Sequence, residues 1–433
     1  MSPITRRSLL ASAAVLSTLG LLSACGWSSS SPSCSAGPVT LSFTFRGPVF
    51  YQNFIKQMVD LFMTKQPNIK IESQPAEWSG YWDKLATMVA GKATPDVIHM
   101  DGKYIADYGG RGVLMDLSNV KGLDLSSLSE SDKQAGMWGG KLYALTTGSN
   151  AFAIFANPSI LAKAGVSLPD DSTWTWADMM TLAKTISDKA GGGIVGLSGG
   201  GTYADLTIFL RQQGEDLYSG TGAGFKPETC AKWLQSYLDV MDSVAGFSAS
   251  KATEDGTASY EQQAFATNKS GLYWSWSNQL GDARKSSGHD DIVMLRPPSA
   301  TGKATDNGLF LKASMFWSIS STTKYPAAAA TFVNFLLNDT DAAAIQLVNR
   351  VVPSSKALLK STKLTATDKD VIAWLDKVRP EITSDPAIQP KGTSDFQNSI
   401  AREFQNVRFK STTPLQSATT LKQTLDSMAA NAK

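Results

Sequence analysis

The apolar residues that follow position 38 change their spacing several times, and this pattern constrains the fold more than any other feature of the chain. Residues 39–45 alternate apolar and polar as in a half-buried strand, and residues 53–66 carry apolar side chains at helical spacing. A short strand at 69–71, a helix at 81–91 and a buried strand at 96–100 follow. This β-α-β-α-β order predicts an α/β fold, with a parallel sheet covered by helices.

Three residues at the carboxyl ends of these expected strands are candidates for ligand binding: Arg46, Trp78 and Asp101. Ligands of open α/β sheets bind outside the carboxyl ends of the strands. A guanidinium donates and a carboxylate accepts paired hydrogen bonds, and an indole ring offers a flat apolar face. In the alternative interpretation, Asp101 only caps the turn at Gly102, and Arg46 is a surface charge.

The first 24 residues have the layout of an export signal, with Arg6 and Arg7, an apolar run and small residues before Cys25. The stretch 22–25, LSAC, resembles a bacterial lipobox, which implies that Cys25 is lipidated; the alternative is an ordinary cleaved signal followed by a chance cysteine. The arginine pair also resembles a twin-arginine signal, although general secretion signals contain such pairs too. Residues 25–37 are rich in Ser, Gly and Pro and predict a flexible tether.

Charge and cysteine content exclude several classes of protein. The chain has 40 Lys and Arg against 38 Asp and Glu, and removal of residues 1–24 takes away two Arg, which leaves 38 of each sign. A neutral chain argues against nucleic-acid binding, which needs a basic surface. Cys25, Cys34 and Cys230 are too few for a disulfide framework and contain no C-x-x-C pair, so we expect no metal site and no cofactor. We also expect no disulfide; the alternative is a bond between Cys34 and Cys230 outside the cell, because the sequence does not determine the distance between their Cα atoms.

The second half of the chain continues the mixture of strands and helices. Residues 151–155 predict a strand, and Thr175 with Asp178 predicts a capping box that opens a helix. Helical patterns occupy 227–244, 326–337, 341–348 and the stretch from about 395. If residues 273–278 are extended, Trp274, Trp276 and Asn278 face one side.

Several segments together resemble one protein family. They are YWDKLATMVAGKATPDVIHMDGKYIADYGGRGVLMD at 81–116, GKLYAL at 140–145, LAKAG at 161–165, WTWADM at 174–179, GLYWSWSN at 271–278, and AAAATFVNFLLND at 327–339 followed by VVP at 351–353. The chain resembles, over about residues 39–355, the family 1 extracellular solute-binding lipoproteins of carbohydrate ABC importers. It departs from them at Phe155-Ala156-Asn157, where the family usually has Tyr-Asn.

The resemblance implies a two-lobed periplasmic-binding-protein-like fold with a hinge between the lobes. The first lobe would hold 38–147 and 319–351, and the second 148–318 and 352–433. A sugar would bind in the cleft, the lobes would close on it, and the protein would deliver it to the permease subunits of an ABC transporter. We therefore expect a monomer, without enzymatic activity, attached to the outer face of the cytoplasmic membrane by lipidated Cys25.

The aromatic and polar residues near the cleft complete the set of candidate ligand contacts. Trp78, Trp274 and Trp276 are expected to stack on sugar faces, with Asn278 beside them. Asn150 and Trp317 are candidates because of their place near the expected hinge. The alternative for each tryptophan is a place in the core.

Other functions remain open at this point. Gly196-Leu197-Ser198-Gly199-Gly200 matches the G-x-S-x-G pattern of serine hydrolases, with His289 or His99 as the histidine. A glycoside hydrolase needs two carboxylates at a fixed separation, which a sequence does not exclude. The G-x-G-x-x-G match at 191–196 precedes a strand instead of following one, so it does not predict dinucleotide binding. A binding protein for a non-sugar polar solute, and a tethered adhesion or signalling protein, are further alternatives.

Overall fold

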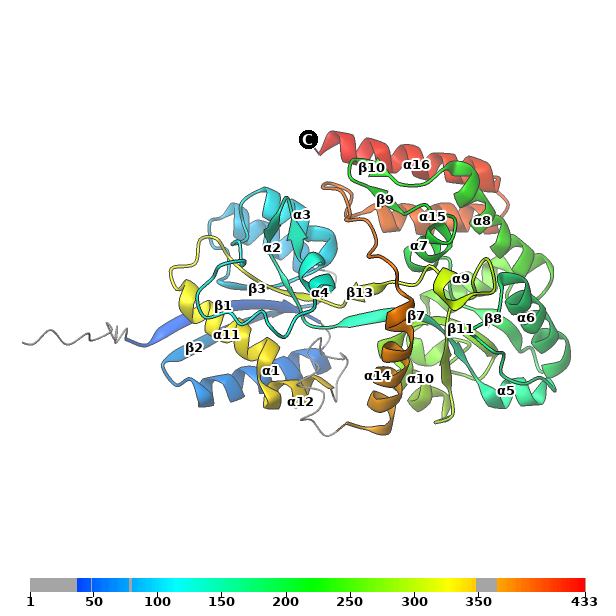
Figure 1. Ribbon diagram of the computed structural model, residues 1–433, viewed down its shortest axis with the longest axis horizontal. Helices are drawn as coiled ribbons and strands as arrows, with labels where there is room; N and C mark the ends of the chain where they lie inside the picture. The colour runs from blue at the N-terminus through cyan, green and yellow to red at the C-terminus, as the bar shows by residue number, and fades with distance from the viewer. Residues whose placement is uncertain (1–36, 48, 78–79, 348–363, 433) are drawn as a thin grey trace, which may run out of the picture. The chain divides into compact units, whose positions relative to one another are not determined.

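The computed structural model describes residues 37–47, 49–77, 80–347 and 364–432 (Figure 1). The chain divides into two units, residues 1–37 and 38–433, and the second contains the folded structure described below. The predicted signal, the lipidation site Cys25 and residues 25–36 of the tether lie outside the described residues, and so does Trp78.

The first sheet has five strands in the order β2-β1-β3-β14-β6. They are β1 (Val39–Arg46), β2 (Ile69–Ala76), β3 (Val97–Met100), β6 (Leu145–Thr146) and β14 (Phe316–Ile319). Strand β1 pairs in parallel with β2 and β3, as the sequence predicts, whereas β14 is antiparallel to both β3 and β6. The predicted parallel pairing of these three strands is confirmed, and a distant segment of the chain adds the antiparallel strand β14 beside them.

Helices cover both faces of the first sheet. Phe43 of β1 packs with Phe332 of α11 (Pro326–Asn338) at 5.1 Å between ring centroids, and Phe332 packs with Phe62 of α1 (Val49–Lys65) at 4.8 Å. A separate apolar cluster joins the sheet to α2 (Tyr81–Ala90) and α3 (Gly102–Gly110). Helix α1 begins four residues before the predicted start at 53. The smaller elements of this part are α4 (Glu130–Gln134), α12 (Thr340–Leu347) and the hairpin strands β4 (Met137–Trp138) and β5 (Lys141–Leu142).

The second sheet is built around β7, whose residues are all buried. Its order is β12-β7-β11-β8, and β13 also pairs with β7. The strands are β7 (Ser149–Ala156), β8 (Val195–Ser198), β11 (Ser270–Trp276), β12 (Val293–Leu295) and β13 (Leu311–Ala313). The predicted strand at 151–155 is confirmed, and its continuous apolar run is explained by burial on both faces.

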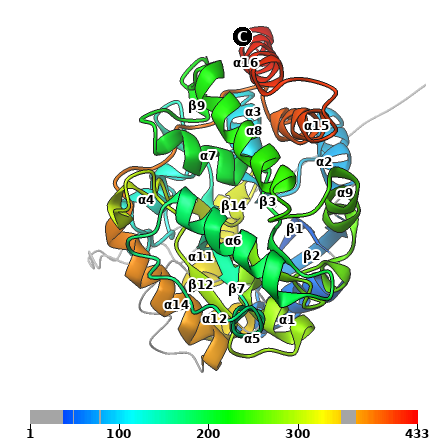
Figure 2. The same ribbon diagram turned by 90° about the vertical axis from the view of Figure 1, so that its right-hand side faces the viewer.

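Two groups of helices belong to the second sheet's part of the chain (Figure 2). The first packs on the sheet in one apolar core and consists of α5 (Pro158–Lys163), α6 (Trp176–Ala190), α10 (Leu280–Ser287) and α14 (Ala366–Val378). The second forms a core of its own and consists of α7 (Tyr203–Arg211), α8 (Pro227–Asp242), α15 (Phe396–Arg408) and α16 (Pro414–Asn431). The capping box of Thr175 and Asp178 is confirmed at the start of α6. The remaining elements are α9 (Ala249–Thr257), β9 (Tyr218–Ser219), β10 (Gly222–Ala223) and short 3-10 helices at Tyr260–Gln262, Ser277–Gln279, Ala304–Asp306 and Arg379–Glu381.

The chain crosses between the two sheets at adjacent places. It leaves the first sheet after β6 and enters β7, and it returns through β13 into β14. Strands β7 and β13 are antiparallel partners, with Asn150 opposite Lys312. The paired crossings fit the expected two-lobed architecture, while the residue bounds of the lobes stay a prediction, and the bound at 351 lies outside the described residues.

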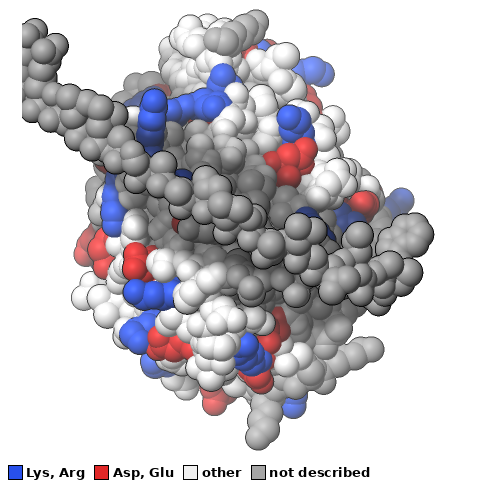
Figure 3. Space-filling view, turned by 90° about the vertical axis from the view of Figure 1, so that its left-hand side faces the viewer, with Lys and Arg blue, Asp and Glu red and all other residues white. Residues whose placement is uncertain are grey.

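The surface and the single described cysteine complete the fold. Among the described residues visible in Figure 3, basic and acidic side chains are interspersed. Within the described ranges, no helix is long and apolar enough to cross a bilayer, and no cluster of His, Cys, Asp and Glu could hold a metal ion. Cys230 is a buried free thiol in α8, and burial raises its pKa to about 12.

Candidate functional site

A cavity of about 480 Å³ lies where the two sheets meet, and we call it the charged cavity. It is lined by residues from the β3–α3 junction, from the crossing strand β13 and from the second group of helices. Its charged lining residues are Asp101, Lys103, Asp132, Lys312 and Asp385, and Tyr203, Phe310 and Phe316 contribute aromatic surface. The carboxyl end of β3 therefore borders a cavity, as the sequence predicts for open α/β sheets.

Arg46 and Asp101 meet at this cavity although they are 55 positions apart. Arg46 Nη2 donates to Asp101 Oδ2 at 2.6 Å, and Asp101 Oδ1 accepts from the Lys103 N–H at 3.2 Å, which caps α3. Burial opposes the ionisation of Asp101, but Lys312, Arg46 and the Lys103 N–H lower its pKa below the ordinary value. Arg46 is only 6% exposed and also covers the Trp82 ring, so the surface-charge interpretation is wrong.

Asp101 thus caps α3 and also lines the cavity, whereas Arg46 is linked to the cavity by its hydrogen bond to Asp101. The pair holds an ionised carboxylate at the cavity wall, with Oδ2 already engaged by a cation. Direct contact of either residue with a ligand stays a prediction.

Lys312 of β13 is a functional candidate that the sequence did not reveal. Its Nζ lies 5.1 Å from the centroid of the Trp276 ring and 5.7 Å from that of Tyr203, both within reach of a cation–π interaction. Burial alone would lower the pKa of Lys312, but Tyr203 and Asp101 outweigh it and the pKa is raised, so the side chain stays a cation. The short strand around Lys312 matches no motif, and only its pairing with β7 brings it to the site.

A second cavity of about 450 Å³ adjoins the first, and we call it the aromatic cavity. Tyr203 and Gln397 line both cavities. The aromatic cavity is also lined by Phe152, Tyr273, Trp274 and Trp276 and by the polar side chains of Thr202, Gln263, Ser275 and Gln279. Such a combination of flat rings and hydrogen-bonding side chains suits a polyhydroxylated ligand, because ring faces cover C–H groups and amides bind hydroxyls.

The predicted alternation of Trp274, Trp276 and Asn278 ends at Trp276. Residues Ser277–Gln279 form a 3-10 helix, which takes Asn278 out of the strand and brings Gln279 into the cavity lining instead. Trp276 is half-buried and exposes part of its ring, whereas Trp274 is 3% exposed and stacks on Phe152 with 5.4 Å between ring centroids. Trp276 is therefore the better placed of the two for a ligand.

The two candidates named for the hinge lie in the protein interior. Trp317 of β14 is 1% exposed and packs on His99 and Phe43, which is the core interpretation of this tryptophan. Asn150 of β7 is buried, and its Oδ1 has no hydrogen-bond partner in the described part of the chain. Neither residue lines the charged cavity or the aromatic cavity.

The residues of the serine hydrolase pattern do not come together. The Ser198 Oγ at the end of β8 is buried and finds no hydrogen-bond partner among the described residues. His289 lies beside Ser159 instead, with 3.2 Å between Nδ1 and Oγ. His99 lies in the first sheet, where it contacts the Tyr51 hydroxyl. A nucleophile and base within hydrogen-bond reach are the signature of such sites, so this interpretation lacks its geometry.

Comparison with known proteins identifies the family. A family model described as bacterial extracellular solute-binding protein matches residues 48–343, which is more than half of the chain. The chain belongs to this family. The resemblance found in the sequence is confirmed, and the chain is a solute-binding protein rather than an enzyme.

Individual relatives are similar to this solute-binding protein in sequence or in structure. The diacetylchitobiose binding protein DasA of Streptomyces coelicolor is 23% identical over 297 residues, 68% of each chain. The arabinooligosaccharide-binding protein of Bacillus subtilis is 28% identical over 235 residues, 53% of each chain. The solved structure of an extracellular solute-binding protein family 1 member from Alicyclobacillus acidocaldarius is similar with a TM-score of 0.71 at 26% identity, and the match covers 91% of this chain and 99% of that one. The predicted two-lobed fold class is therefore confirmed.

Proposed function

We propose that this solute-binding protein captures an oligosaccharide in the charged and aromatic cavities. The observation that carries the proposal is that the two cavities adjoin and share Tyr203 and Gln397 in their linings, so that together they offer room for more than one ring. Each volume falls within the range of about 300–1,000 Å³ that ligand pockets commonly have. The two curated relatives, named for binding diacetylchitobiose and arabinooligosaccharide, support a sugar ligand.

Each cavity contributes a different part of the recognition. In the aromatic cavity, the half-buried Trp276 ring would stack on a sugar face, and Gln279 and Gln397 would bind hydroxyls. In the charged cavity, Asp101 would accept from hydroxyl groups, since bonds to charged groups contribute about 1.5–3 kcal/mol each. Lys312 lies between these two sets of side chains and would hold the ligand at their junction.

We further propose that the protein acts outside the cytoplasmic membrane, anchored by lipidated Cys25, and delivers the sugar to an ABC permease. The lipobox-like LSAC at 22–25 supports the anchor, and membership of the family supports the permease partner. Metabolic labelling with a fatty acid analogue tests the anchor, with Cys25→Ala as the unlabelled control. Labelling that persists in this variant would contradict the assignment of Cys25.

A thermal-shift screen of the purified, ligand-free protein against neutral mono- and oligosaccharides tests the sugar proposal. A ligand at 100 times its dissociation constant stabilises by about 2.7 kcal/mol. We expect a clear shift with an oligosaccharide that Trp276→Ala abolishes and Trp138→Ala retains. Trp138 is a matched control because it is also half-buried, and it lines neither cavity. If no sugar shifts the melting temperature of the folded protein, the ligand is the alternative, a non-sugar polar solute.

A further inference from the structure

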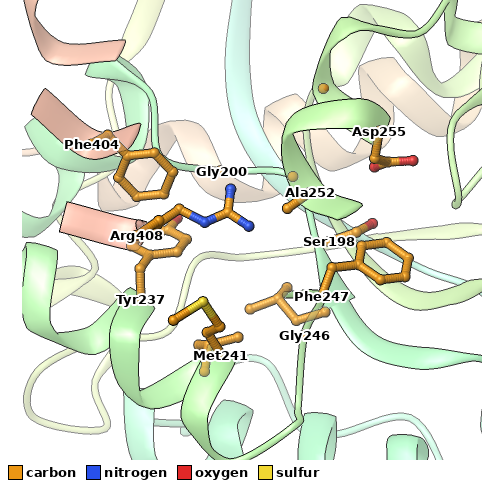
Figure 4. Close-up of a pocket in the computed structure, with 14 residues that line it drawn as sticks. Ser198, Gly200, Tyr237, Met241, Gly246, Phe247, Ala252, Asp255, Phe404 and Arg408 are labelled. Carbon is orange, nitrogen blue, oxygen red and sulfur yellow. The ribbon is translucent and has the colours of Figure 1, made fainter. Parts of the chain in front are cut away.

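A third and smaller cavity of about 90 Å³ adjoins the aromatic cavity (Figure 4). The two share Gly199, Gly200, Asp255 and Gly256 in their linings. The small cavity is further lined by Ser198 of β8, by Tyr237 of α8 and by Phe404 and Arg408 of α15, among others. It is therefore a side chamber next to the proposed sugar site.

Arg408 brings a positive charge into this chamber. Its guanidinium is half-buried and lies 5.3 Å from the centroid of the Phe404 ring, and its hydrogen bond, to the Ser248 carbonyl, is long at 3.5 Å. Within the described ranges, no carboxylate lies within 4.0 Å of it. Burial lowers the pKa of Arg408, although Tyr237 partly offsets this. Charges removed from water are normally paired, but this guanidinium forms no ion pair with the described residues.

Ser198 supplies a second unsatisfied group in the same chamber. Its side chain is 5% exposed, and its Oγ has no hydrogen-bond partner in the described part of the chain. Figure 4 shows the Ser198 hydroxyl and the Arg408 guanidinium among the side chains of this one chamber. A hydroxyl donor together with a guanidinium is a donor set that suits an oxyanion.

The glycine loop between the two cavities keeps a narrow backbone wall. Gly199, Gly200 and Gly201 all have positive φ, at 71°, 77° and 72°, and a Cβ on Gly200 would collide with the Tyr237 hydroxyl. Asp205 holds this wall in place, because its Oδ2 accepts from the Gly201 N–H at 3.0 Å and from the Tyr237 hydroxyl at 2.6 Å. The small cavity and the aromatic cavity therefore meet at this loop and at Asp255 and Gly256, which line both of them.

We propose that the chamber binds an oxyanion, a carboxylate, sulfate or phosphate group, through Arg408 and Ser198. The group is either a substituent of the sugar in the adjoining aromatic cavity or a free inorganic anion. In the first case the inference rests on the proposed function and deepens it, because the protein would then select acidic oligosaccharides.

Asp255 should weaken anion binding in this chamber, and its replacement offers a second test. Its carboxyl lines the chamber and accepts from the Ala264 N–H at 2.6 Å through Oδ1, and burial raises its pKa. A carboxylate facing the same space repels an anion. Asp255→Asn keeps the shape and the acceptor oxygen but removes this charge, so it should strengthen anion binding.

Isothermal titration of the full chain with sulfate, phosphate, a neutral disaccharide and a disaccharide uronic acid tests the proposal, with chloride used to match the ionic strength. We expect Arg408→Gln to weaken binding of the anionic probes about 10-fold or more, because the variant loses the charge-assisted hydrogen bonds to the oxyanion. Arg402→Gln is the matched control, because Arg402 lies on the same helix with its side chain 60% exposed, and it should bind like the wild type. Ser198→Ala should weaken the same probes more modestly.

The outcomes separate the two sources of the anion. Competition between the uronic acid and the neutral disaccharide, both bound in the wild type, assigns the group to the sugar ligand. Sulfate or phosphate that binds alongside the neutral disaccharide assigns it to a free anion. Anionic probes that do not bind, or that bind equally well to Arg408→Gln, would overturn the proposal. Binding of the neutral disaccharide is measured independently, so the sugar function can stand or fall separately.

Discussion

Replacement of His99 by Gln should remove a large part of the pH dependence of folding stability on the acid side of neutrality. His99 is fully buried in β3, directly before Met100 and Asp101, and its ring packs between those of Tyr51 and Trp317. Burial lowers its pKa to about 3, Arg46 adds to the effect, and Asp101 opposes it. The folded protein therefore keeps a neutral ring at pH values where the unfolded chain protonates it.

The magnitude follows from linkage between protonation and folding. The unfolded chain binds a proton on this ring below about pH 6.5, and the folded chain does not bind one until about pH 3. Acidification therefore favours the unfolded state, by ~1.4 kcal/mol per pH unit once the unfolded ring is protonated. Between about pH 7.5 and 4.5 the integrated loss from this one residue is ~2.7 kcal/mol.

Urea unfolding at several pH values measures this quantity. The wild type should lose ~2.7 kcal/mol more than His99→Gln over the stated interval, even though the variant is less stable at neutral pH because the ring contacts are lost. His289→Gln is the matched control and should follow the wild type, because this second histidine lies near the surface beside Ser159. Equal pH dependence in the wild type and His99→Gln would refute the reasoning.

Three further predictions concern groups whose contacts are unusual. Asp101→Asn should lower the free energy of unfolding at neutral pH by about 1–3 kcal/mol, because the charge facing Arg46 is lost. The pKa of Asp101 is lowered in the folded protein, so the stability difference between wild type and variant should shrink as the pH falls below about 4, as measured by urea unfolding. Asp205→Ala should lower the free energy of unfolding by about 3–5 kcal/mol, because the buried carboxylate accepts hydrogen bonds from Gly201, Thr202, Trp233 and Tyr237. In the control Asp188→Ala, the carboxylate is exposed and the loss should be under about 0.5 kcal/mol. Similar losses in both variants would contradict this prediction. Val244 has a positive φ of 62° and is 66% exposed, so Val244→Gly should stabilise the protein by up to about 1 kcal/mol. Val244→Ala keeps the Cβ and its backbone strain and should not stabilise it. A loss of stability in the glycine variant would contradict the assignment of backbone strain.

The sequence predicted those parts of the protein that depend on local patterns. The parallel strands β1, β2 and β3 were predicted from apolar periodicity, and the capping box at Thr175 from residue types three positions apart. The place of Asp101 at the end of β3 followed from the order of the elements. The family was identifiable because its segments occur in sequence over most of the chain. These signals lie within one element or between neighbouring elements, so no long-range contact was needed to detect them.

Only the tertiary structure decided which side chains share a cavity. Lys312, Tyr203 and Gln397 come from a crossing strand, from α7 and from a helix near the C-terminus, and no spacing in the sequence relates them. Trp317 and Trp276 look alike in the sequence, but β14 pairs inside the first sheet and buries one, whereas the 3-10 turn after β11 leaves the other half-exposed at a cavity. Burial and proximity are set by packing between distant segments, and this is why the elements could be predicted while the composition of the site could not.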